Sequence, residues 1–326
     1  MPWDQRIKRR LKLRDLDMLM AVIRCGSMAK AANQIAVSQP AVSKAISDME
    51  RTLGVQLLDR TAQGVTPTLY GNALQKWATA VFDDLRQGVN ELEFLADPTI
   101  GEVRVGCSEP MQGGFVPHVI DRLTRKHPRI SIHVAQLSVW MGQLHELRGR
   151  TIDLQVGRIK QPFAEDDLQA ETLFYEGAYI VAAAHNPLCR RRNLRLADLV
   201  DEHWSLPPPR TNVAGMLFAE AFEKQGLDLP KKTVLTASIQ VHCALLMTGR
   251  YLAVFPGSLL QFGMKNLPLK ILPVDMVMAQ NPVGIVTLKN RILSPVARLF
   301  IDCAREVAKT MSPPKSGGIR NTRTRI

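Results

Sequence analysis

SMAKAANQIAVSQPAVSKAISDMERTLGVQLLDR, residues 27–60, is the stretch that decides how this chain folds. Ser27 is a good N-cap for a short helix, and Ser38 is a good N-cap for a second helix that follows a tight turn. Pro40 falls in the first turn of the second helix, where its missing N–H breaks no hydrogen bond. This order of capped helix, turn and proline-started helix predicts a helix-turn-helix, whose second helix enters the major groove of DNA.

The second predicted helix has two different faces. Its apolar residues are spaced by four, three and four positions, which predicts a buried stripe made by Val42, Ile46, Met49 and Leu53. The opposite face carries Gln39, Pro40, Ser43, Lys44 and Ser47. Short polar groups and a lysine at the front of a helix can reach base edges and phosphates. Such a face alone is more typical of a solvated helix, so the DNA-binding interpretation depends on the complete arrangement.

Residues 31–60 resemble the winged helix-turn-helix signature of the LysR-type transcriptional regulators. The residues expected at the DNA are Ser27, Ser38, Gln39, Pro40, Ser43, Lys44 and Arg60. The resemblance implies that residues 54–58 lead into the wing, and that Arg60 contacts the DNA backbone or the minor groove beside it. The chain departs from the family at Leu58, where phenylalanine is frequent, and at Gln63, near which a basic residue is frequent.

The length and composition limit the classes of protein to which this chain can belong. The chain has 326 residues, 46% of them hydrophobic, which is enough for two or three packed domains. The net charge of +12 suggests a polyanionic partner such as nucleic acid, although basic residues at both ends supply much of the excess. No secretory signal peptide and no run of about 18 apolar residues is visible, so we expect a cytoplasmic protein without a membrane partner.

The five cysteines lie far apart, at positions 25, 107, 189, 243 and 303. Their odd number and the lack of a CxxC or Cys/His cluster indicate neither a disulfide framework nor a zinc site. We expect buried thiols, and a redox-sensing pair is the alternative. The sequence also has no GxSxG, HExxH or P-loop motif, and no GxGxxG that opens a βα unit. It therefore predicts no catalytic residue, no metal and no cofactor.

A long helix is predicted from Thr68, which can cap it, to Leu95, with Pro98 beyond its end. At about 1.5 Å per residue it would be roughly 40 Å long. Its apolar residues form a heptad seam of Leu74, Ala78, Val81, Leu85, Gly88, Leu92 and Leu95. We expect a homodimer, because two recognition helices are needed to read a two-fold DNA site. The dimer contacts would be made by Leu74, Val81, Leu85 and Leu92. The alternative is packing against the chain's own later domain.

From Gly101 on, predicted strands and helices alternate, which indicates parallel sheets with covering helices. The family resemblance implies two α/β lobes, like those of periplasmic solute-binding proteins, with a small molecule in the cleft. The fold class is therefore α/β with a helix-rich N-terminal domain: a winged helix-turn-helix, a long linker helix and a two-lobed periplasmic-binding-protein-like effector domain. The predicted ranges are 10–67 for DNA binding, 68–97 for the linker, 98–310 for the effector domain and 311–326 for a basic, disordered tail. Lobe one takes residues 100–177 and 282–310, and lobe two takes residues 178–281.

Candidate effector-binding residues lie where predicted strands give way to helices, because ligands in such folds sit beyond the carboxyl ends of strands. They are Ser108, Ser138, Arg158, Thr211, Ser238 and Phe255, with Phe255 and Pro256 expected on a wall of the cleft. Hydroxyls and N–H groups at helix starts suit carboxylates or sugar hydroxyls, and Arg158 can pair with a carboxylate. Glu109, next to Ser108, opposes an anionic ligand. Sugars, sugar acids and aromatic acids therefore stay open as effectors, and His242 is expected to be structural.

The leading hypothesis is a ligand-responsive transcription factor that binds an interrupted palindrome near a promoter as a homodimer or homotetramer. Its effector would favour one geometry of the cleft, and RNA polymerase would be a further partner. One alternative is a solute-binding or carrier protein, which would not need residues 27–60. The other is a cytosolic α/β enzyme that uses the same cleft, which would need a convergent acid/base pair. We expect no enzyme.

Overall fold

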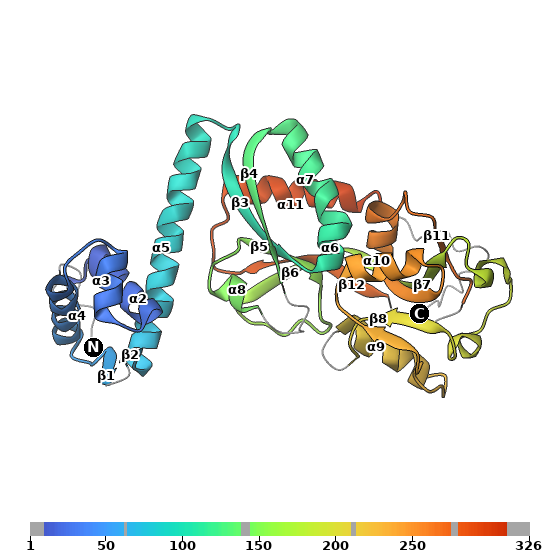
Figure 1. Cartoon of the computed structure of the whole chain (residues 1–326). Coiled ribbons are helices and arrows are strands. Elements are labelled where there is room, and N and C mark those ends of the chain that lie inside the picture. The colour runs from blue at the N-terminus through green and yellow to red at the C-terminus, as the bar shows by residue number, and fades with distance from the viewer. Residues whose placement is uncertain (1–9, 62–63, 138–143, 210–212, 275–279, 312–326) are drawn as a thin grey trace. The chain divides into compact units, whose positions relative to one another are not determined.

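The computed structural model describes residues 10–61, 64–137, 144–209, 213–274 and 280–311 (Figure 1). The chain divides into two compact units, residues 1–88 and 89–326, and each is described by itself. The first unit begins with α2 (Leu13–Cys25), α3 (Met28–Gln34), α4 (Gln39–Leu53), β1 (Leu58–Thr61) and β2 (Gly64–Pro67). No helix in the described ranges has both the length and the apolar composition to cross a membrane.

Local signals set the ends of these helices. Gly26 ends α2 with a φ of 62°, a left-handed conformation that glycine adopts without strain. Ser27 Oγ accepts a hydrogen bond from Lys30 N at 3.4 Å, and Ser38 Oγ accepts one from Ala41 N at 3.4 Å. Both serines are therefore the N-caps that the sequence predicted.

The three helices share one hydrophobic core. Val42, Ile46 and Met49 of α4 are buried, and Leu53 packs against the same core while partly buried. The predicted stripe of α4 thus faces inward, and the polar face on its other side is left for solvent or a ligand.

The linker helix α5 (Leu69–Ala96) is one continuous helix. Thr68 Oγ1 accepts a hydrogen bond from Gly71 N at 3.1 Å, so Thr68 caps it as predicted. Two members of the predicted seam face the core of the first unit, since Ala78 is buried there and Leu74 packs against it. The exposed large apolar residues of α5 are Leu69, Tyr70, Trp77, Val81, Leu85, Val89, Leu92 and Leu95.

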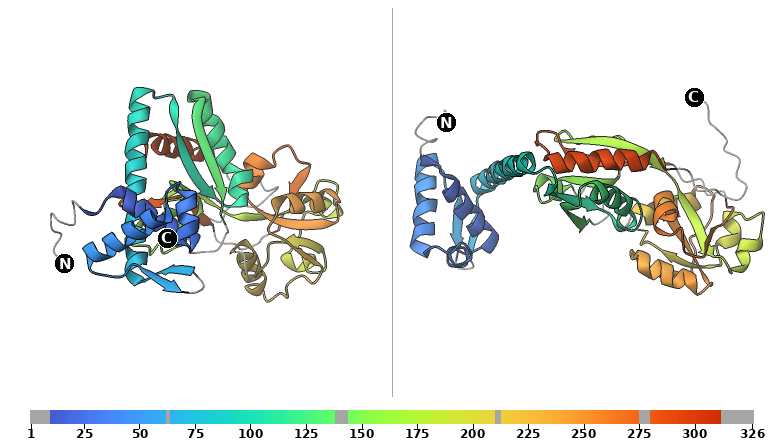
Figure 2. Two further views of the ribbon diagram at one scale, coloured as in Figure 1. Left: turned by 60° about the vertical axis from the view of Figure 1, so that its left-hand side comes forward. Right: turned by 90° about the horizontal axis from the view of Figure 1, so that it is seen from above.

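Each of the two larger sheets in the second unit is the centre of a lobe (Figures 1 and 2). Lobe one contains β3 (Ile100–Cys107), α6 (Glu109–Gly113), α7 (Phe115–Lys126), β4 (Arg129–Gln136), α8 (His145–Arg148), β5 (Leu154–Arg158), β6 (Leu168–Glu176), β12 (Asn281–Leu288) and α11 (Pro295–Ala308). Its strand order is β4–β3–β5–β12–β6. Helices α7 and α11 lie side by side against the sheet (Figure 2) and bury Phe115, Leu123 and Phe300.

Lobe two contains β7 (Ala178–Ala183), η1 (Pro187–Arg190), η2 (Leu196–Leu199), β8 (His203–Leu206), α9 (Val213–Glu223), β9 (Thr233–Leu235), α10 (Ile239–Met247), β10 (Tyr251–Pro256), η3 (Leu259–Gly263) and β11 (Leu269–Ile271). Its strand order is β11–β7–β10–β8–β9. Three aromatic rings hold α9 to this sheet: Trp204 lies 5.1 Å from Phe218 and 6.1 Å from Phe222 between ring centroids. The two separate sheets, one in each lobe, confirm the two-lobed α/β fold predicted from the sequence.

Both sheets are mixed, which corrects the prediction of parallel sheets. Strand β3 runs parallel to β4 and β5, and β8 runs parallel to β9 and β10, as in βαβ units. Strand β12, however, is antiparallel to β5 and β6, and β7 is antiparallel to β10 and β11. The chain passes directly from β6 in one sheet to β7 in the other, and β12 returns to the first. A strand that arrives from the other lobe need not follow the direction that a covering helix imposes.

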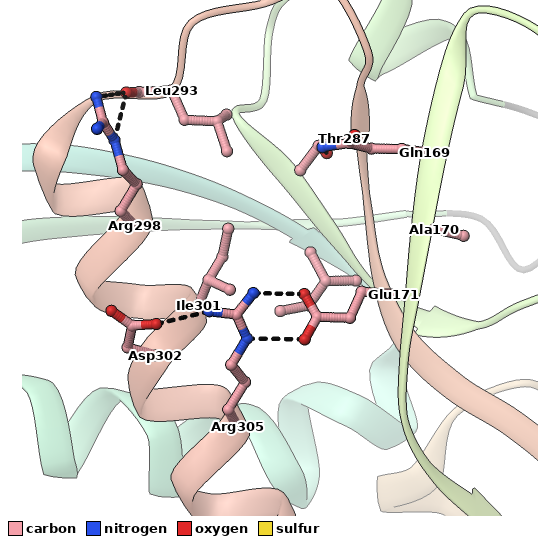
Figure 3. A pocket seen from close by; sticks show the side chains of 10 residues that line it. Gln169, Ala170, Glu171, Thr287, Leu293, Arg298, Ile301, Asp302 and Arg305 are labelled. Carbon is pink, nitrogen blue, oxygen red and sulfur yellow. Dashed lines mark hydrogen bonds and ion pairs between the residues drawn. The ribbon is translucent and has the colours of Figure 1, made fainter.

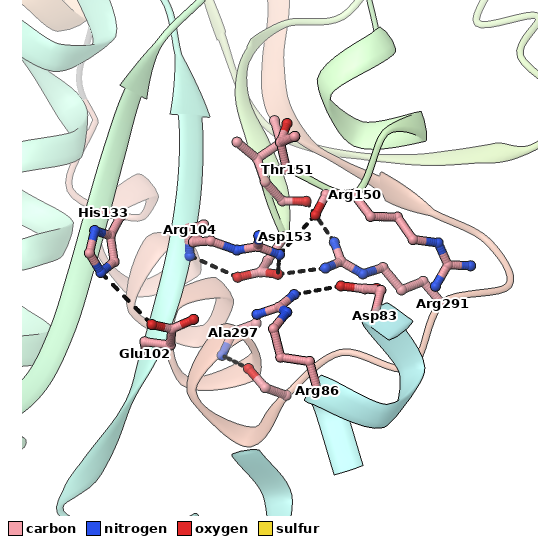
Figure 4. A network of polar contacts seen from close by, with 12 residues as sticks. Asp83, Arg86, Glu102, Arg104, His133, Arg150, Thr151, Asp153, Arg291 and Ala297 are labelled. Atoms are coloured by element: carbon pink, nitrogen blue, oxygen red, sulfur yellow. Dashed lines mark hydrogen bonds and ion pairs between the residues drawn. The ribbon is translucent and has the colours of Figure 1, made fainter. Parts of the chain in front are cut away.

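A buried ion network joins β3, the residue before β5 and the segment before α11 (Figure 4). Asp153 Oδ1 lies 3.0 Å from Arg104 Nη2 and 2.6 Å from Arg291 Nη2, and the side chain of Arg291 is completely buried. Arg291 Nη1 also donates to the Ile152 carbonyl at 2.6 Å. Burial raises the pKa of Asp153, but hydrogen bonds from Arg104 and the charges of both arginines outweigh it, so the pKa is lowered overall. Asp153 is therefore an ionised structural residue of lobe one.

Candidate nucleic-acid interface and effector region

The front of α4 presents the polar groups that the sequence assigned to DNA. Gln39, Pro40 and Lys44 are exposed, and Ser43 is half-buried between them and the core. Because Ser38 caps the helix and the opposite face is packed, these side chains project from a rigid element. Ser27 and Ser38, predicted in the same group, hold helix ends with their hydroxyls.

The turn between α3 and α4 depends on one unusual residue. Ala36 adopts a φ of 54°, in the left-handed region that costs a non-glycine residue strain. The Val37 amide donates to the Ala32 carbonyl at 3.0 Å across the turn. The chain thereby reverses within a few residues, and α4 starts directly after α3.

The wing is the antiparallel pair of β1 and β2, with Arg60 exposed opposite Val65. Glu50, which the sequence did not single out, fixes its start, since its carboxylate accepts hydrogen bonds from Leu57 N at 2.8 Å and Leu58 N at 3.3 Å. On β2, the Val65 amide donates to the Gly26 carbonyl at 2.9 Å and ties the wing to the end of α2. Gln63 lies outside the described residues. Glu50 could have been recognised as an acid one turn before a helix-ending glycine.

Two of the predicted effector residues stand at neighbouring helix starts. Ser108 precedes α6 and Ser238 precedes α10, and neither side chain caps its helix. The Glu109 carboxylate accepts a hydrogen bond from Ile239 N at 2.9 Å, which brings the two helix starts together across the lobes. Ser138 and Thr211 lie outside the described residues.

Arg158 is the last residue of β5, which pairs with β3 in the sheet of lobe one, and Ser108 directly follows β3. Arg158 is half-buried, and desolvation lowers the pKa of its guanidinium, while the nearby Glu176 charge opposes the shift. Glu176 ends β6 on the other side of β12 and accepts a hydrogen bond from Ser258 N at 3.0 Å. The arginine is thus at the boundary of the lobes, next to a carboxylate of the chain itself.

Phe255 is placed differently from the sequence-based expectation. Its ring is fully buried in the core of lobe two, 5.9 Å from His242 between ring centroids, rather than on an open wall. It was misplaced because a residue at the end of a core strand can face either side of the sheet. His242 Nδ1 lies 2.7 Å from Ser205 Oγ, and burial lowers its pKa to about 4. His242 is therefore a neutral structural histidine, as expected.

A surface groove of about 530 Å³ lies between β6, β12 and α11 (Figure 3). Arg305 crosses it and donates to both carboxylate oxygens of Glu171, at 2.7 and 2.8 Å. The hydrogen bonds from Arg305 lower the pKa of Glu171, and those to Glu171 raise the pKa of Arg305. The central charges of the groove thus satisfy each other, and none of them was a predicted site residue.

The five cysteines are free, and burial raises the pKa of the Cys107 thiol to about 12. Among the residues that the structure describes, no group of three or more His, Cys, Asp or Glu side chains could hold a metal ion.

Two family models match the chain. One, described as bacterial regulatory helix-turn-helix protein, lysR family, matches residues 13–72. The other, described as LysR substrate binding domain, matches residues 96–309. The chain belongs to the LysR family. It is a DNA-binding, ligand-responsive transcriptional regulator.

Relatives of LysR type align with the chain along nearly its whole length. The HTH-type transcriptional regulator GbpR of Azospirillum brasilense is 31% identical over 93% of this chain and 89% of its own. The HTH-type transcriptional regulator TdcA of Escherichia coli K12 is 26% identical over 90% of this chain and 93% of its own. Among solved structures, full-length OxyR of Pseudomonas aeruginosa has a TM-score of 0.64 at 21% identity and covers 93% of this chain and 99% of its own. The LysR regulator CbnR, solved with its target DNA, has a TM-score of 0.62 at 19% identity, covering 91% of this chain and 100% of its own.

Proposed function

We propose that this LysR-family regulator reads its operator with the front of α4, using Gln39, Pro40, Ser43 and Lys44, and that Arg60 of the wing contacts the adjacent backbone or minor groove. The observation that carries the proposal is the packing of α4, whose buried stripe faces the core and leaves the capped polar end exposed. Ser27 and Ser38 support the same surface by fixing the helix ends.

The exposed stripe of α5 is the proposed contact between two copies. Val81, Leu85 and Leu92 contribute to it, whereas Leu74 chiefly supports the core of its own unit. A homodimer places two copies of α4 against the half-sites of an interrupted palindrome. A homotetramer and a contact with RNA polymerase extend this proposal. Chromosomal DNA as the target places the protein in the cytoplasm.

The proposed effector site lies between the lobes, at the starts of α6 and α10. Ser108 and Ser238 have hydroxyls that cap no helix there, and Arg158 lies at the same boundary of the lobes. Ser138 and Thr211 stay in the proposal from the sequence alone. The effector is a sugar, sugar acid or aromatic acid, and a panel of these compounds tested by thermal unfolding will find it, because a ligand that binds the native state raises Tm.

Replacing Ser43 and Lys44 together by alanine tests the DNA surface. We expect binding to DNA that flanks the protein's own gene to weaken by roughly 1–3 kcal/mol for each lost base contact. If Lys44 neutralises a phosphate in each protomer, the slope of log K against log salt falls by about 2 for the dimer. Fluorescence anisotropy at several salt concentrations measures both quantities.

The matched control is Lys76→Ala, which removes the same charge from an exposed position of α5. It should leave the affinity and the salt slope near those of the unmodified protein. An alanine pair at 43 and 44 that binds as well as the Lys76→Ala control would refute the assignment of α4.

A further inference from the structure

A carboxylate of lobe one completes a helix of lobe two. Glu109 is the first residue of α6, and its Oε1 accepts a hydrogen bond from the backbone amide of Ile239 at 2.9 Å. Ile239 is the first residue of α10, a nine-residue helix. The two residues are 130 positions apart in the sequence, so this contact depends entirely on how the lobes meet.

Helix α10 lacks a cap of its own. Ser238 occupies the N-cap position, but its side chain makes no capping hydrogen bond. The first amides of a helix need an outside acceptor, and a negative charge there is favoured by the helix dipole. The carboxylate of Glu109 supplies both the hydrogen-bond acceptor and the negative charge. Its charge also acts further along α10, where it adds to burial in raising the pKa of the Cys243 thiol.

A second carboxylate repeats this arrangement. Glu176, at the end of β6 in lobe one, accepts a hydrogen bond from Ser258 N at 3.0 Å, directly before η3 of lobe two. Glu176 is only 4% exposed, and its other oxygen, Oε1, has no hydrogen-bond partner within the described part of the chain. Two acids of one lobe thus hold backbone amides at two helix starts of the other.

We propose that Glu109 and Glu176 form a carboxylate latch between the lobes, and that Glu109 occupies the anion site which the start of α10 would otherwise offer to an effector. The part of the effector that meets α10 is then an uncharged hydrogen-bonding group such as a hydroxyl, and not a carboxylate. This proposal rests on the effector site proposed above.

Electrostatics explain why the effector group that meets α10 is uncharged. An exposed helix start with free amides binds anions readily. With Glu109 already there, a ligand carboxylate would approach a like charge and would have to displace a tethered group. A hydroxyl can instead donate to the carboxylate without breaking its bond to Ile239. The latch therefore selects against small acids at this end of the cleft.

Hydrogen–deuterium exchange of the full-length chain tests the latch without knowledge of the effector. In Glu109→Ala, the first-turn amides of α10 should exchange roughly fivefold faster, as for a lost N-cap. Acetate, used as the probe, should restore their protection in Glu109→Ala and change nothing in the unmodified protein. Sodium chloride at the same ionic strength should not restore it. In Glu109→Gln, which keeps a neutral acceptor, the first-turn amides of α10 should exchange at a rate between those of Glu109→Ala and the unmodified protein.

The control is Glu223→Ala, which removes an exposed acid from α9 in the same lobe and should leave α10 unchanged. Unaltered exchange of α10 in Glu109→Ala would overturn the latch. Protection of α10 by acetate in the unmodified protein would overturn the claim that the anion site is taken. DNA binding of Glu109→Ala is measured in parallel. If α10 exchange is unchanged and DNA binding is lost, the result counts against both the latch and the proposed effector domain. If α10 exchange is unchanged and DNA binding is intact, only the latch is refuted.

Discussion

Leu85→Arg is the sharpest test of the dimer proposed for α5. The Leu85 side chain is 48% exposed in the described chain and lies in the exposed apolar stripe of the helix. Burying a whole leucine side chain is worth about 1.5–3 kcal/mol, so covering the exposed half contributes about 0.7–1.4 kcal/mol per protomer. Two copies in a symmetric dimer contribute about 1.5–3 kcal/mol, which corresponds to a roughly 10- to 150-fold change in Kd.

The introduced arginine weakens the dimer further, beyond the loss of the leucine contact. It brings two like charges to the same seam, and each must be partly desolvated when the copies meet. We therefore expect the dimer Kd to rise at least about tenfold. Sedimentation equilibrium over a dilution series measures the Kd directly.

The same substitution at a different surface leucine is the control. Leu229 is 42% exposed, follows α9, and lies far along the chain from the stripe. Leu229→Arg should leave the Kd unchanged. If Leu85→Arg has the same mass distribution as Leu229→Arg at every concentration, the reasoning about α5 is refuted.

Three further predictions concern stability and are checked by denaturation. Asp153→Ala leaves a buried arginine unpaired and should cost about 3–5 kcal/mol in guanidinium unfolding, whereas Asp121→Ala, in an exposed pair, should cost about 1 kcal/mol or less. His242 has a native pKa of about 4, below its unfolded value, so stability is lost as the pH falls from about 6.5 to 4; the loss is about 3 kcal/mol, and His242→Gln should flatten this dependence. Gly71→Ala places a methyl group against the Leu57 carbonyl and should lower the unfolding free energy of the first unit by about 1–3 kcal/mol; an unchanged Tm would contradict this packing.

The parts of the structure that local chemistry determines were readable from the sequence. Ser27, Ser38 and Thr68 were predicted as caps because a cap depends on residues three positions away. The faces of α4 followed from the spacing of its apolar residues, since helical periodicity relates sequence to direction in space. The order of strands and helices in the effector region followed in the same way, apart from α6, β6, β11 and the short helices η1, η2 and η3.

Features that depend on long-range contacts were not readable. The antiparallel direction of β12 is decided by the chain's return from lobe two, and nothing within residues 281–288 encodes it. Leu74 and Leu85 belong to the same predicted heptad seam. Of these two leucines, only Leu74 packs against the core of the first unit. Glu109 was noticed in the sequence as a charge that opposes anions. Its bond to Ile239 could not be foreseen, because the partner is a backbone amide 130 residues away.

The central claim is that a pair of α4 helices reads a two-fold DNA site, and binding to DNA that flanks the protein's own gene tests it most directly. Fluorescence anisotropy with that DNA and with a shuffled duplex of equal composition gives both affinities at each salt concentration. The account predicts at least about a 10³-fold preference for the native sequence and a log–log salt slope steep enough for several phosphate contacts. Equal affinity for the two duplexes, or binding that does not respond to salt, would contradict it.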